Sequence, residues 1–331
     1  MIDRELWNRC RYVEGDPQGH YESYFQRANH PERPLAFWIR YTVFSPKGRP
    51  SDAVGELWAI YFDGERNSVT AVKQVVPIRD CRFAQPGLDV RMGEASLTAG
   101  LFQGCAHSGG NALQWDLRYS GDESPLLLLP ESFYARGFPK AKALVGTPNA
   151  IFDGTLSVNG AVVDVCGWVG SQNHNWGSKH TDSYAWGQVA GFDSAPHAFL
   201  ECSTARLKFG PFWTPPLTLV VLRLEGEEIR LNSLAQAFRA HGDFDFVSWR
   251  FDTRTPVVRL RGSIHAPKSL FVGLTYNNPP GGTKTCLNTK LAACELIVER
   301  VGQPPRTLAT KHRAAFEILT DREDHGVPIA A

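Results

Sequence analysis

The sequence predicts an all-β protein made of antiparallel sheets, and three observations support this fold class. Apolar residues recur at every second position in many short runs, which is the period of a strand with one buried face. Turn dipeptides such as Asp-Gly and Asn-Gly separate several of these runs and are typical of tight hairpins. Strands do not alternate with long amphipathic helices, so a parallel, doubly wound sheet is not expected.

The first half of the chain opens with DRELWNRC, which can form a short helix, and continues as successive hairpins. The clearest strands are LAFWIRYTVF (35–44), ELWAIYF (56–62) and SVTAVKQVV (68–76), with Asp63-Gly64 as the turn between the last two. Their β-branched and aromatic residues are typical of strands. These three runs therefore predict an antiparallel meander.

The second half repeats this pattern and adds one helix. NSLAQAFRAHG (232–242) predicts a helix, because Asn232 or Ser233 can cap its beginning and Gly242 can end it. Further hairpin turns are predicted at Asp153-Gly154, Asn159-Gly160 and Glu225-Gly226.

Composition limits the classes of partner. The chain has 331 residues, of which 43% are hydrophobic and 21% charged, with a net charge of +1. A charge this small creates no field that attracts nucleic acid or an anionic membrane. No apolar run is long enough for an integral membrane segment, and the charged N-terminus does not resemble a signal peptide. Seven scattered cysteines without a CxxC motif predict reduced thiols in a cytoplasmic protein.

The length predicts about two domains, at roughly 150 residues each. A Gly-, Pro- and Lys-containing segment at 136–152 is the expected boundary, which gives domains 1–145 and 146–331. Each half then holds about eight to ten strands, enough to close a small barrel.

Three segments resemble one known family. His174-Asn175-Trp176-Gly177, which follows Gly167-Trp168 and precedes Tyr184-Ala185-Trp186, is similar to the HNWG signature of the carotenoid hydratase, tocopherol cyclase and AttH-like superfamily. TYNNPPGGTKTCLNTKLA (275–292) resembles a C-terminal segment of that group. HYESYFQR (20–27) resembles its first aromatic strand, although Ser23 stands where an aromatic residue is usual.

This resemblance implies a fold and a chemistry. The fold is two packed lipocalin-like (calycin-type) antiparallel β-barrels with few short helices, the second carrying the HNWG motif. The chemistry of known members is protonation of an alkene followed by hydration or cyclisation, without a cofactor. Barrels of this kind also bind ligands without turning them over, so the fold alone does not decide the function.

Strand alternation gives an independent prediction of the site. In a strand over 184–189, Tyr184, Trp186 and Gln188 share a face. In a strand over 197–204, Phe199 and Glu201 share a face with His197 and Ser203. Two strands that carry aromatic and polar groups on one face are typical of a pocket with a few polar groups among aromatic side chains.

Alkene protonation requires a neutral acid, and a carboxyl group in an apolar pocket keeps its proton. Glu201 is the first candidate for this catalytic acid, with Asp182 and Glu22 behind it. His174 is the candidate that orients water or removes a proton from the cation. Indole and phenol faces can stabilise a carbocation. The substrate-binding candidates are Trp176, Tyr184, Trp186, Gln188, Phe199, Glu22 and Tyr24. We expect Glu201, His174 and Trp176 to converge in one cavity inside a barrel.

Other chemistries have no motif in the sequence. HxH and HExxH are absent, and so are a P-loop, a GxGxxG fingerprint and a GxSxG elbow. We therefore expect neither a metal nor a cofactor.

The leading hypothesis is a cytoplasmic, acid-catalysed hydratase or cyclase that acts on an apolar, unsaturated, isoprenoid-like molecule. The alternatives are a lipocalin-like carrier for an apolar ligand and a family member whose pocket is filled. Structural roles also stay open for the candidates: Glu201 in an ion pair or at the surface, His174 bonded to backbone, and the aromatic cluster as core.

Overall fold

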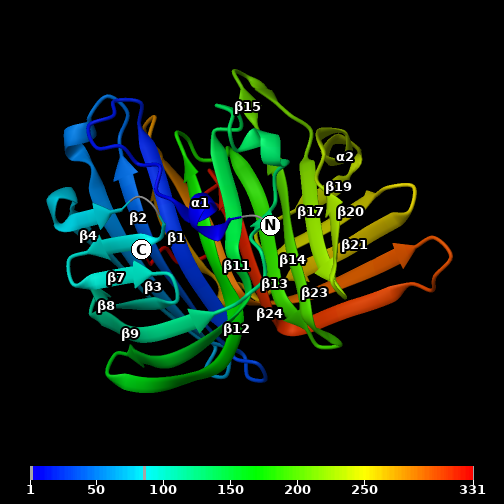
Figure 1. The fold of residues 1–331 in the computed structure, drawn as a ribbon, viewed down its shortest axis with the longest axis horizontal. Coiled ribbons are helices and arrows are strands. Elements are labelled where there is room, and N and C mark those ends of the chain that lie inside the picture. Colours follow the sequence, from blue (N-terminus) through cyan, green and yellow to red (C-terminus); the bar gives the residue numbers. More distant parts are fainter. Residues whose placement is uncertain (1–2, 85–86, 331) are drawn as a thin grey trace.

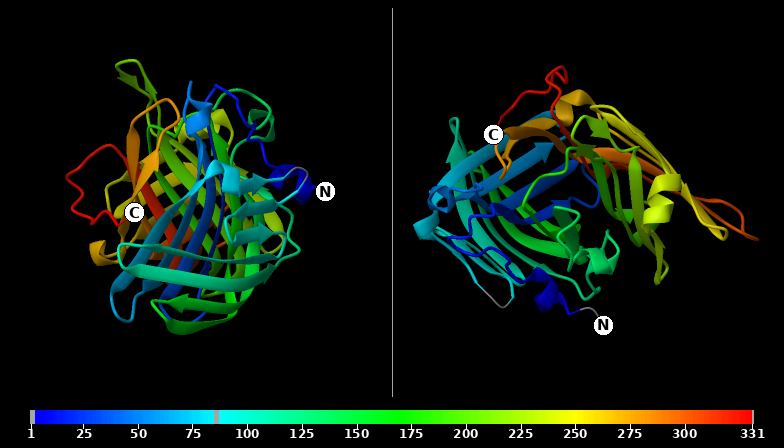
Figure 2. Two further views of the ribbon diagram at one scale, coloured as in Figure 1. Left: turned by 90° about the vertical axis from the view of Figure 1, so that its left-hand side faces the viewer. Right: turned by 90° about the horizontal axis from the view of Figure 1, so that it is seen from above.

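The computed structural model describes residues 3–84 and 87–330 and shows an all-β fold, which confirms the predicted class. Two large antiparallel sheets lie side by side and follow one another along the chain (Figure 1). The first sheet curls into a nearly closed barrel, and the second curves beside it, as the view from above shows (Figure 2). The structure therefore has the two-barrel arrangement that the sequence predicts.

The first sheet has twelve strands: β1 (His20–Asn29), β2 (Leu35–Ser45), β3 (Val54–Asp63), β4 (Ser68–Pro77), β5 (Cys81–Phe83), β6 (Asp89–Met92), β7 (Ala95–Thr98), β8 (Leu101–Ser108), β9 (Asn111–Ser120), β10 (Leu126–Leu127), β11 (Ala141–Val158) and β12 (Ala161–Gly177). Their order is β4-β3-β2-β1-β12-β11-β9-β8-β7-β6-β5, with β10 beside β11. The edge strands β4 and β5 are joined directly by a short 3-10 helix, η2 (Ile78–Asp80), so the sheet turns back on itself. In β9, Leu113, Trp115 and Leu117 are buried and alternate with exposed residues, as a barrel wall requires.

The second sheet has ten strands: β13 (Ser183–Phe192), β14 (Ala195–Arg206), β17 (Leu217–Leu224), β18 (Glu227–Leu231), β19 (His241–Phe244), β20 (Ser248–Arg254), β21 (Val258–His265), β22 (Val272–Asn277), β23 (Thr283–Arg300) and β24 (Arg306–Thr320). Their order is β18-β17-β14-β13-β24-β23-β21-β20-β19, with β22 beside β23. The short strands β15 (Lys208–Phe209) and β16 (Phe212–Trp213) pair only with each other. Three further 3-10 helices are η1 (Pro50–Asp52), η3 (Glu131–Phe133) and η4 (Lys268–Leu270).

The contact between the two sheets explains why β1 and β2 are buried on both faces. Tyr24 and Ile39 belong to the core inside the first barrel, whereas Phe25 and Trp38 belong to a separate cluster with Trp186 and other residues of the second sheet. All ten positions of β1 except the first are buried. A strand covered on both sides has no solvent-facing side, so its sequence loses the alternation of a half-exposed strand.

Both helices are short. α1 (Arg4–Asn8) begins after Asp3, whose side chain accepts hydrogen bonds from two backbone N–H groups. α2 (Leu234–Arg239) begins after Ser233, which forms a reciprocal capping box with Gln236, so the predicted cap is confirmed. Gly242 lies in β19 and does not end α2. In the part of the chain that the structure describes, neither helix is long and apolar enough to span a bilayer.

One predicted hairpin turn is wrong. Asp153-Gly154 lies inside β11, where the pairing with β12 is irregular, so the dipeptide forms a bulge. Gly154 has a φ of +129°, and a Cβ atom there would lie 2.2 Å from the carbonyl oxygen of Asp116 in β9. Glycine is therefore needed for the close approach of two strands. The turns predicted at Asn159-Gly160 and Glu225-Gly226 are confirmed. Asp63-Gly64 lies where β3 ends and the turn to β4, residues 64–67, begins, so that turn is confirmed too.

The limits of the two expected domains, 1–145 and 146–331, stay a prediction. Position 145 lies inside β11, which pairs with β12 on both sides of that point. The chain passes from the first sheet to the second between Gly177 and Ser183. The HNWG residues consequently form the end of β12, in the first sheet.

Candidate active site

A cavity of about 210 Å³ lies between the two sheets. Its walls come from β1, β2, β11 and β12 of the first sheet, from β13, β14, β17, β22 and β24 of the second, and from α2 and neighbouring loops. The lining is mainly apolar and aromatic, with Phe25, Trp38, Trp186 and Leu219 among its members. We expected the pocket inside one barrel, and the structure places it between the two, because aromatic side chains of β1 and β2 face outward from the first barrel.

Glu201 of β14 is the polar residue at the centre of the network beside this cavity. Its side chain is buried, and its Oε1 atom accepts a hydrogen bond from Trp186 Nε1 at 2.8 Å. Its Oε2 atom accepts one from Gln188 Nε2, also at 2.8 Å. Burial raises the pKa of Glu201 to about 7, although these two hydrogen bonds favour the ionised form. Glu201 therefore titrates near neutral pH, in an apolar cavity.

Gln188 of β13 is held in one orientation by Arg27 of β1. The guanidinium only donates hydrogen bonds, and its Nε atom lies 2.7 Å from Gln188 Oε1. The amide nitrogen of Gln188 must then face Glu201 and the Asn173 oxygen, which it reaches at 2.8 Å. Arg27 is fully buried, and burial lowers its pKa to about 9. This chain of contacts joins the first sheet to the candidate acid of the second.

A second buried polar group stands on the neighbouring strands β23 and β24. Lys290 donates to Glu317 at 2.8 Å and to the Asn288 side chain at 2.6 Å. The ammonium nitrogen also lies 5.6 Å from the ring centroids of Trp38 and Trp186. Burial lowers the pKa of Lys290, and the Glu317 carboxylate opposes that effect. Glu317 lines the cavity, so this ion pair forms part of its wall.

Arg40, His180 and Tyr276 form a third polar group in the cavity lining. The Arg40 guanidinium lies 4.5 Å from the Tyr276 ring centroid, and its Nε atom donates to Thr42 Oγ1 at 2.9 Å. Among the described residues, no carboxylate forms an ion pair with Arg40. Burial lowers the pKa of His180 to about 3, so its imidazole is neutral at physiological pH.

Several predicted site residues lie at or beside the cavity. Tyr184, Trp186 and Glu201 line it, and Gln188 contacts Glu201 directly. Phe199 lies deeper, in an apolar cluster with Leu128 and Val221. Asp182 lies next to the lining residue Thr181. Although burial opposes it, hydrogen bonds from Lys179 and the backbone of Lys208 lower the pKa of Asp182, so it is ionised and is a poor proton donor.

The other four predicted residues lie on the opposite side of the β1–β12 pair. His174, Trp176, Glu22 and Tyr24 do not line the cavity. Along β12, Asn173 and Asn175 face the cavity, so His174 and Trp176 face the other way. The expectation that His174, Trp176 and Glu201 converge in one chamber is therefore corrected, because alternation separates neighbouring residues of a strand.

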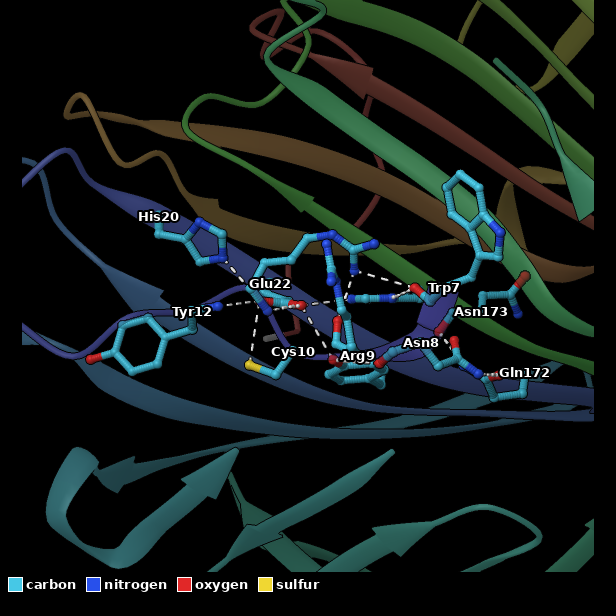
Figure 3. Close-up of polar contacts among 12 residues, drawn as sticks. Trp7, Asn8, Arg9, Cys10, Tyr12, His20, Glu22, Gln172 and Asn173 are labelled. Atoms are coloured by element: carbon cyan, nitrogen blue, oxygen red, sulfur yellow. Dashed lines mark hydrogen bonds and ion pairs between the residues drawn. The ribbon is translucent and has the colours of Figure 1, made fainter. Parts of the chain in front are cut away.

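His174 and Glu22 instead hold the N-terminal segment, residues 3–19, against the first barrel. His174 Nε2 lies 2.7 Å from Glu22 Oε1, and its Nδ1 lies 3.2 Å from the Trp7 carbonyl oxygen. Glu22 also accepts hydrogen bonds from the backbone N–H groups of Arg11 and Tyr12 (Figure 3). Burial would raise the pKa of Glu22, but hydrogen bonds from His174 and His20 lower it below its usual value. This arrangement supports the structural alternative for the HNWG histidine.

Trp176 contributes to the same attachment. The Arg11 guanidinium lies 3.6 Å from the Trp176 ring centroid, which is a cation–π contact. The His174 ring centroid lies 4.7 Å from that of Trp176 and 4.1 Å from that of Tyr24. Two residues of the motif thus bind the segment that crosses the end of the first barrel.

Sequence reasoning missed five polar residues at the site: Arg27, Arg40, Asn173, Lys290 and Glu317. A signal was present for two of them. Arg40 interrupts the aromatic run LAFWIRYTVF, and Lys290 lies between Thr289 and Leu291 in CLNTKLA, so each places a long cation in a run that is read as a strand. A charge in such a position requires a buried partner or a ligand.

Metal ligation has no support within residues 3–84 and 87–330, where no group of three or more His, Cys, Asp or Glu side chains is placed to hold an ion. The ionisable side chains described at the site are the carboxyl groups of Glu201 and Glu317 and the buried cations Arg27, Arg40 and Lys290, with His180 held neutral.

The fold and this site define a class, a double β-barrel with an acid-bearing cavity between its halves, and comparisons with known proteins agree with the fold. The chain is similar over 94% of its length to the AttH-like protein NE1406 of Nitrosomonas europaea, covering 98% of it, with a TM-score of 0.58 and 13% identity. Kievitone hydratase of Nectria haematococca matches 93% of the chain and 91% of its own, with a TM-score of 0.59 and 12% identity. CghA, solved with Sch210972, matches 92% of this chain over 88% of its own length, with a TM-score of 0.53 and 12% identity. These TM-scores and coverages show a shared fold, and they confirm the expected resemblance at the level of the fold.

Sequence relatives add no activity. The uncharacterized proteins MT0513 and Rv0493c of Mycobacterium tuberculosis are each 27% identical to 67% of this chain. The match spans 64% of the length of these curated relatives. No protein-family model matches the chain.

Proposed function

We propose that this protein is a hydratase- or cyclase-type enzyme in which Glu201 protonates a carbon–carbon double bond of an apolar, unsaturated small molecule. The observation that carries the proposal is a buried carboxyl group in the wall of an aromatic cavity, with its pKa raised to about 7. Two solved proteins of the same fold are a hydratase and CghA, and the former supports hydration as the reaction type.

The hydrogen bonds of Glu201 leave its proton available to a ligand. Trp186 and Gln188 both donate to the carboxyl oxygens, and neither can accept a proton from them. The acidic hydrogen of neutral Glu201 therefore points away from both partners. The proton adds to one alkene carbon, the π electrons form the new C–H bond, and the other carbon becomes a cation while Glu201 becomes a carboxylate.

The reaction then ends in one of two ways. In hydration, a water oxygen bonds to the cation, and the proton that water loses returns to Glu201. In cyclisation, a second double bond of the ligand attacks the cation, and a proton lost from carbon restores neutral Glu201. Each route regenerates the acid and needs no further reactant besides water.

The surroundings of Glu201 stabilise both charges that form. The rings of Trp186 and Trp38 line the cavity and offer cation–π attraction of about 2 kcal/mol or more in a desolvated site. The new carboxylate keeps its two N–H donors, with Arg27 behind Gln188. Donors that are already oriented toward a developing charge lower the barrier to its formation.

The substrate that fits this cavity is an isoprenoid-like or other unsaturated hydrocarbon chain with one oxygen-bearing end. Arg40 supports the second feature, because its guanidinium lines the cavity with no ion-pair partner among the described residues. A carbonyl or carboxylate oxygen of the ligand would offset the cost of that buried charge. Trp38 Nε1, also unpartnered within the described part of the chain, is a further donor in the lining.

The test is turnover of prenyl and polyene compounds, with and without a terminal carboxylate, in heavy-oxygen water. We expect label incorporation or a cyclic isomer with the native protein, and a loss of turnover of about 10²-fold or more in Glu201→Gln with ligand affinity retained. Glu56→Gln is the matched control, because Glu56 is a buried carboxyl group that pairs with Lys73 and does not line the cavity. Equal turnover in the native and Glu201→Gln proteins would exclude Glu201 as the acid.

The alternative is a carrier that binds an apolar ligand unchanged, which the apolar lining of the cavity also favours. Native mass spectrometry distinguishes the two functions. Recovery of intact ligand from both the native protein and Glu201→Gln, with no labelled or isomerised product across the panel, would support the carrier.

A further inference from the structure

The mouth of the cavity carries the exposed aromatic side chains of this protein. Among the described residues, five Phe or Trp side chains are at least 41% exposed: Phe138, Phe209, Phe212, Trp213 and Phe238. All of them lie in three segments that also contribute residues to the cavity lining. The first segment contributes Phe138 and Pro139, the second Leu207 and Leu217, and the third Leu234 and Ala237. Exposed aromatic residues grouped at one opening mark an interaction surface.

One aromatic contact joins two of these three segments, because the rings of Phe138 and Phe209 lie 6.4 Å apart between centroids. Phe212 is 74% exposed and begins β16, in a two-stranded hairpin that pairs with no other strand. The hairpin and α2 both lie toward the upper edge of the molecule in the view of Figure 1. We call the five aromatic residues, together with five basic residues of the same segments, the aromatic rim; the basic residues are Arg136, Lys140, Arg206, Lys208 and Arg239.

Basic side chains without acidic partners are interleaved with the aromatic ones. Five exposed cations belong to the same three segments: Arg136, Lys140, Arg206, Lys208 and Arg239. Within the described residues none of the five forms an ion pair. Arg206 and Lys208 lie 5.3 Å and 5.8 Å from the Trp213 ring centroid. The whole chain carries a net charge of only +1, so the rim is a local concentration of positive charge.

We propose that the aromatic rim docks on a lipid bilayer that contains anionic headgroups, with the cavity mouth facing the membrane. Exposed aromatic rings enter the boundary between headgroups and acyl chains, while Lys and Arg side chains bind anionic headgroups beside them. The apolar lining continues from the rim into the cavity. An apolar ligand thereby passes from the membrane to the cavity without entering bulk water. Docking goes beyond the proposed function and does not depend on proton transfer by Glu201.

The net charge of +1 predicts no attraction between the protein as a whole and an anionic membrane. The rim differs from the whole protein, because its basic residues lie together at the cavity mouth. Attraction to an anionic surface acts within about one Debye length, roughly 8 Å at physiological ionic strength. The rim's own cations therefore decide the interaction, and distant charges contribute little.

The test is co-sedimentation of the whole protein with vesicles of phosphatidylcholine alone or with added phosphatidylserine. We expect binding to the anionic vesicles that weakens with salt, and binding at least about tenfold weaker in Phe212→Ser/Trp213→Ser and in Arg206→Glu/Lys208→Glu. The matched control is Val162→Ser/Val301→Ser, which removes two valines that are 68% and 76% exposed at other positions. The control should bind as the native protein does.

Several outcomes would overturn the docking proposal. They are no binding to either vesicle at low salt, and equal binding by the rim variants and the native protein. A third is a protein–protein complex, seen by sedimentation velocity without lipid, that the Phe212→Ser/Trp213→Ser variant dissociates. Glu201→Gln should bind vesicles as the native protein does, so failure of the chemistry and failure of docking are separate results.

Discussion

Replacing Glu201 by glutamine tests the claim that this carboxyl group is neutral in the folded protein near pH 7. Burial raises the pKa of Glu201 from its usual 4.5 to about 7. The difference, about 2.5 pH units between the folded and unfolded chains, corresponds to about 3 kcal/mol of unfolding free energy.

The sign of the effect follows from proton binding in the two states. Below pH 4.5 the carboxyl group is protonated in both, so it contributes no pH dependence. Between pH 4.5 and pH 7 the folded protein holds a proton that the unfolded chain releases, so rising pH destabilises the folded state. Above pH 7 the full cost of burying the charge is present. The variant has no ionisable group at this position and does not have this loss.

The assay is urea unfolding of the native protein and Glu201→Gln from pH 4.5 to pH 8.5. We expect the stability of the native protein relative to the variant to fall by about 3 kcal/mol across that range. The variant also turns an amide NH₂ toward either Trp186 or Gln188, both donors, which costs about 1–3 kcal/mol. This second cost does not depend on pH. The test is therefore the change with pH of the difference in unfolding free energy between the two proteins, and not the size of that difference at one pH.

A control variant is available at the surface. Glu65 pairs with Arg33, which lowers the pKa of Glu65, so above about pH 5.5 the carboxyl group is ionised in both states. The difference between the native protein and Glu65→Gln should therefore be flat from about pH 5.5 to pH 8.5. A flat difference for Glu201→Gln as well would refute the neutral buried acid and with it the proton donor.

Three further predictions concern the polar groups around the site. Lys290→Met leaves Glu317 as a buried charge without its cation, so the unfolding free energy measured in urea should fall by about 3–5 kcal/mol. The double variant Lys290→Met/Glu317→Leu should restore most of that stability, and equal losses of stability in both variants would contradict this explanation. Arg27→Met removes a cation that lowers the pKa of Glu201, so the alkaline limb of any pH–rate profile should move to higher pH, and a shift to lower pH would contradict the assigned contact. His174→Phe should increase amide hydrogen exchange in the N-terminal segment and leave ligand affinity within about twofold, whereas unchanged exchange would rule out the attachment role.

The fold could be predicted because its determinants are local. Alternation in WDLRY and the Asn159-Gly160 and Glu225-Gly226 turns indicate antiparallel hairpins without knowledge of the partners. The error at Asp153-Gly154 has a tertiary cause, since the glycine serves the approach of β11 to Asp116 in β9. The same dipeptide suits a hairpin turn and a bulge, and only the neighbouring strand distinguishes them.

The part of the candidate site on β13 and β14 could also be predicted, because its geometry depends on the alternation of side chains along neighbouring strands. Alternation placed Trp186 and Gln188 on one face and Glu201 on another, and these faces meet because Gln188 pairs with Glu201 and Trp186 with Ser203 across β13 and β14. Arg27 and Lys290 could not be placed, because their partners lie 161 and 27 residues away and in one case on another sheet. Sequence spacing carries no information about which face of one sheet meets another.

The HNWG residues lie on β12, a strand whose side chains form hydrogen bonds on both of its faces. Ser171 and Asn173 bond Gln188 or each other on the cavity side, whereas Gln172 and His174 bond Asn8 and Glu22 on the barrel side. Both sides of this strand are buried and both are polar, so each hydrogen-bond set must be complete for the strand to keep its register.

This double role links the N-terminal segment to the cavity through the backbone of β12. A slip of one residue would exchange His174 for Asn173 and remove the oxygen that Gln188 contacts, and with it one of the contacts that hold the Gln188 amide beside Glu201. We therefore expect the attachment of residues 3–19 on one side to maintain the position of Gln188 beside Glu201 on the other, although His174 does not line the cavity. In this way the motif would support the proposed proton donor without contact between its histidine and the cavity.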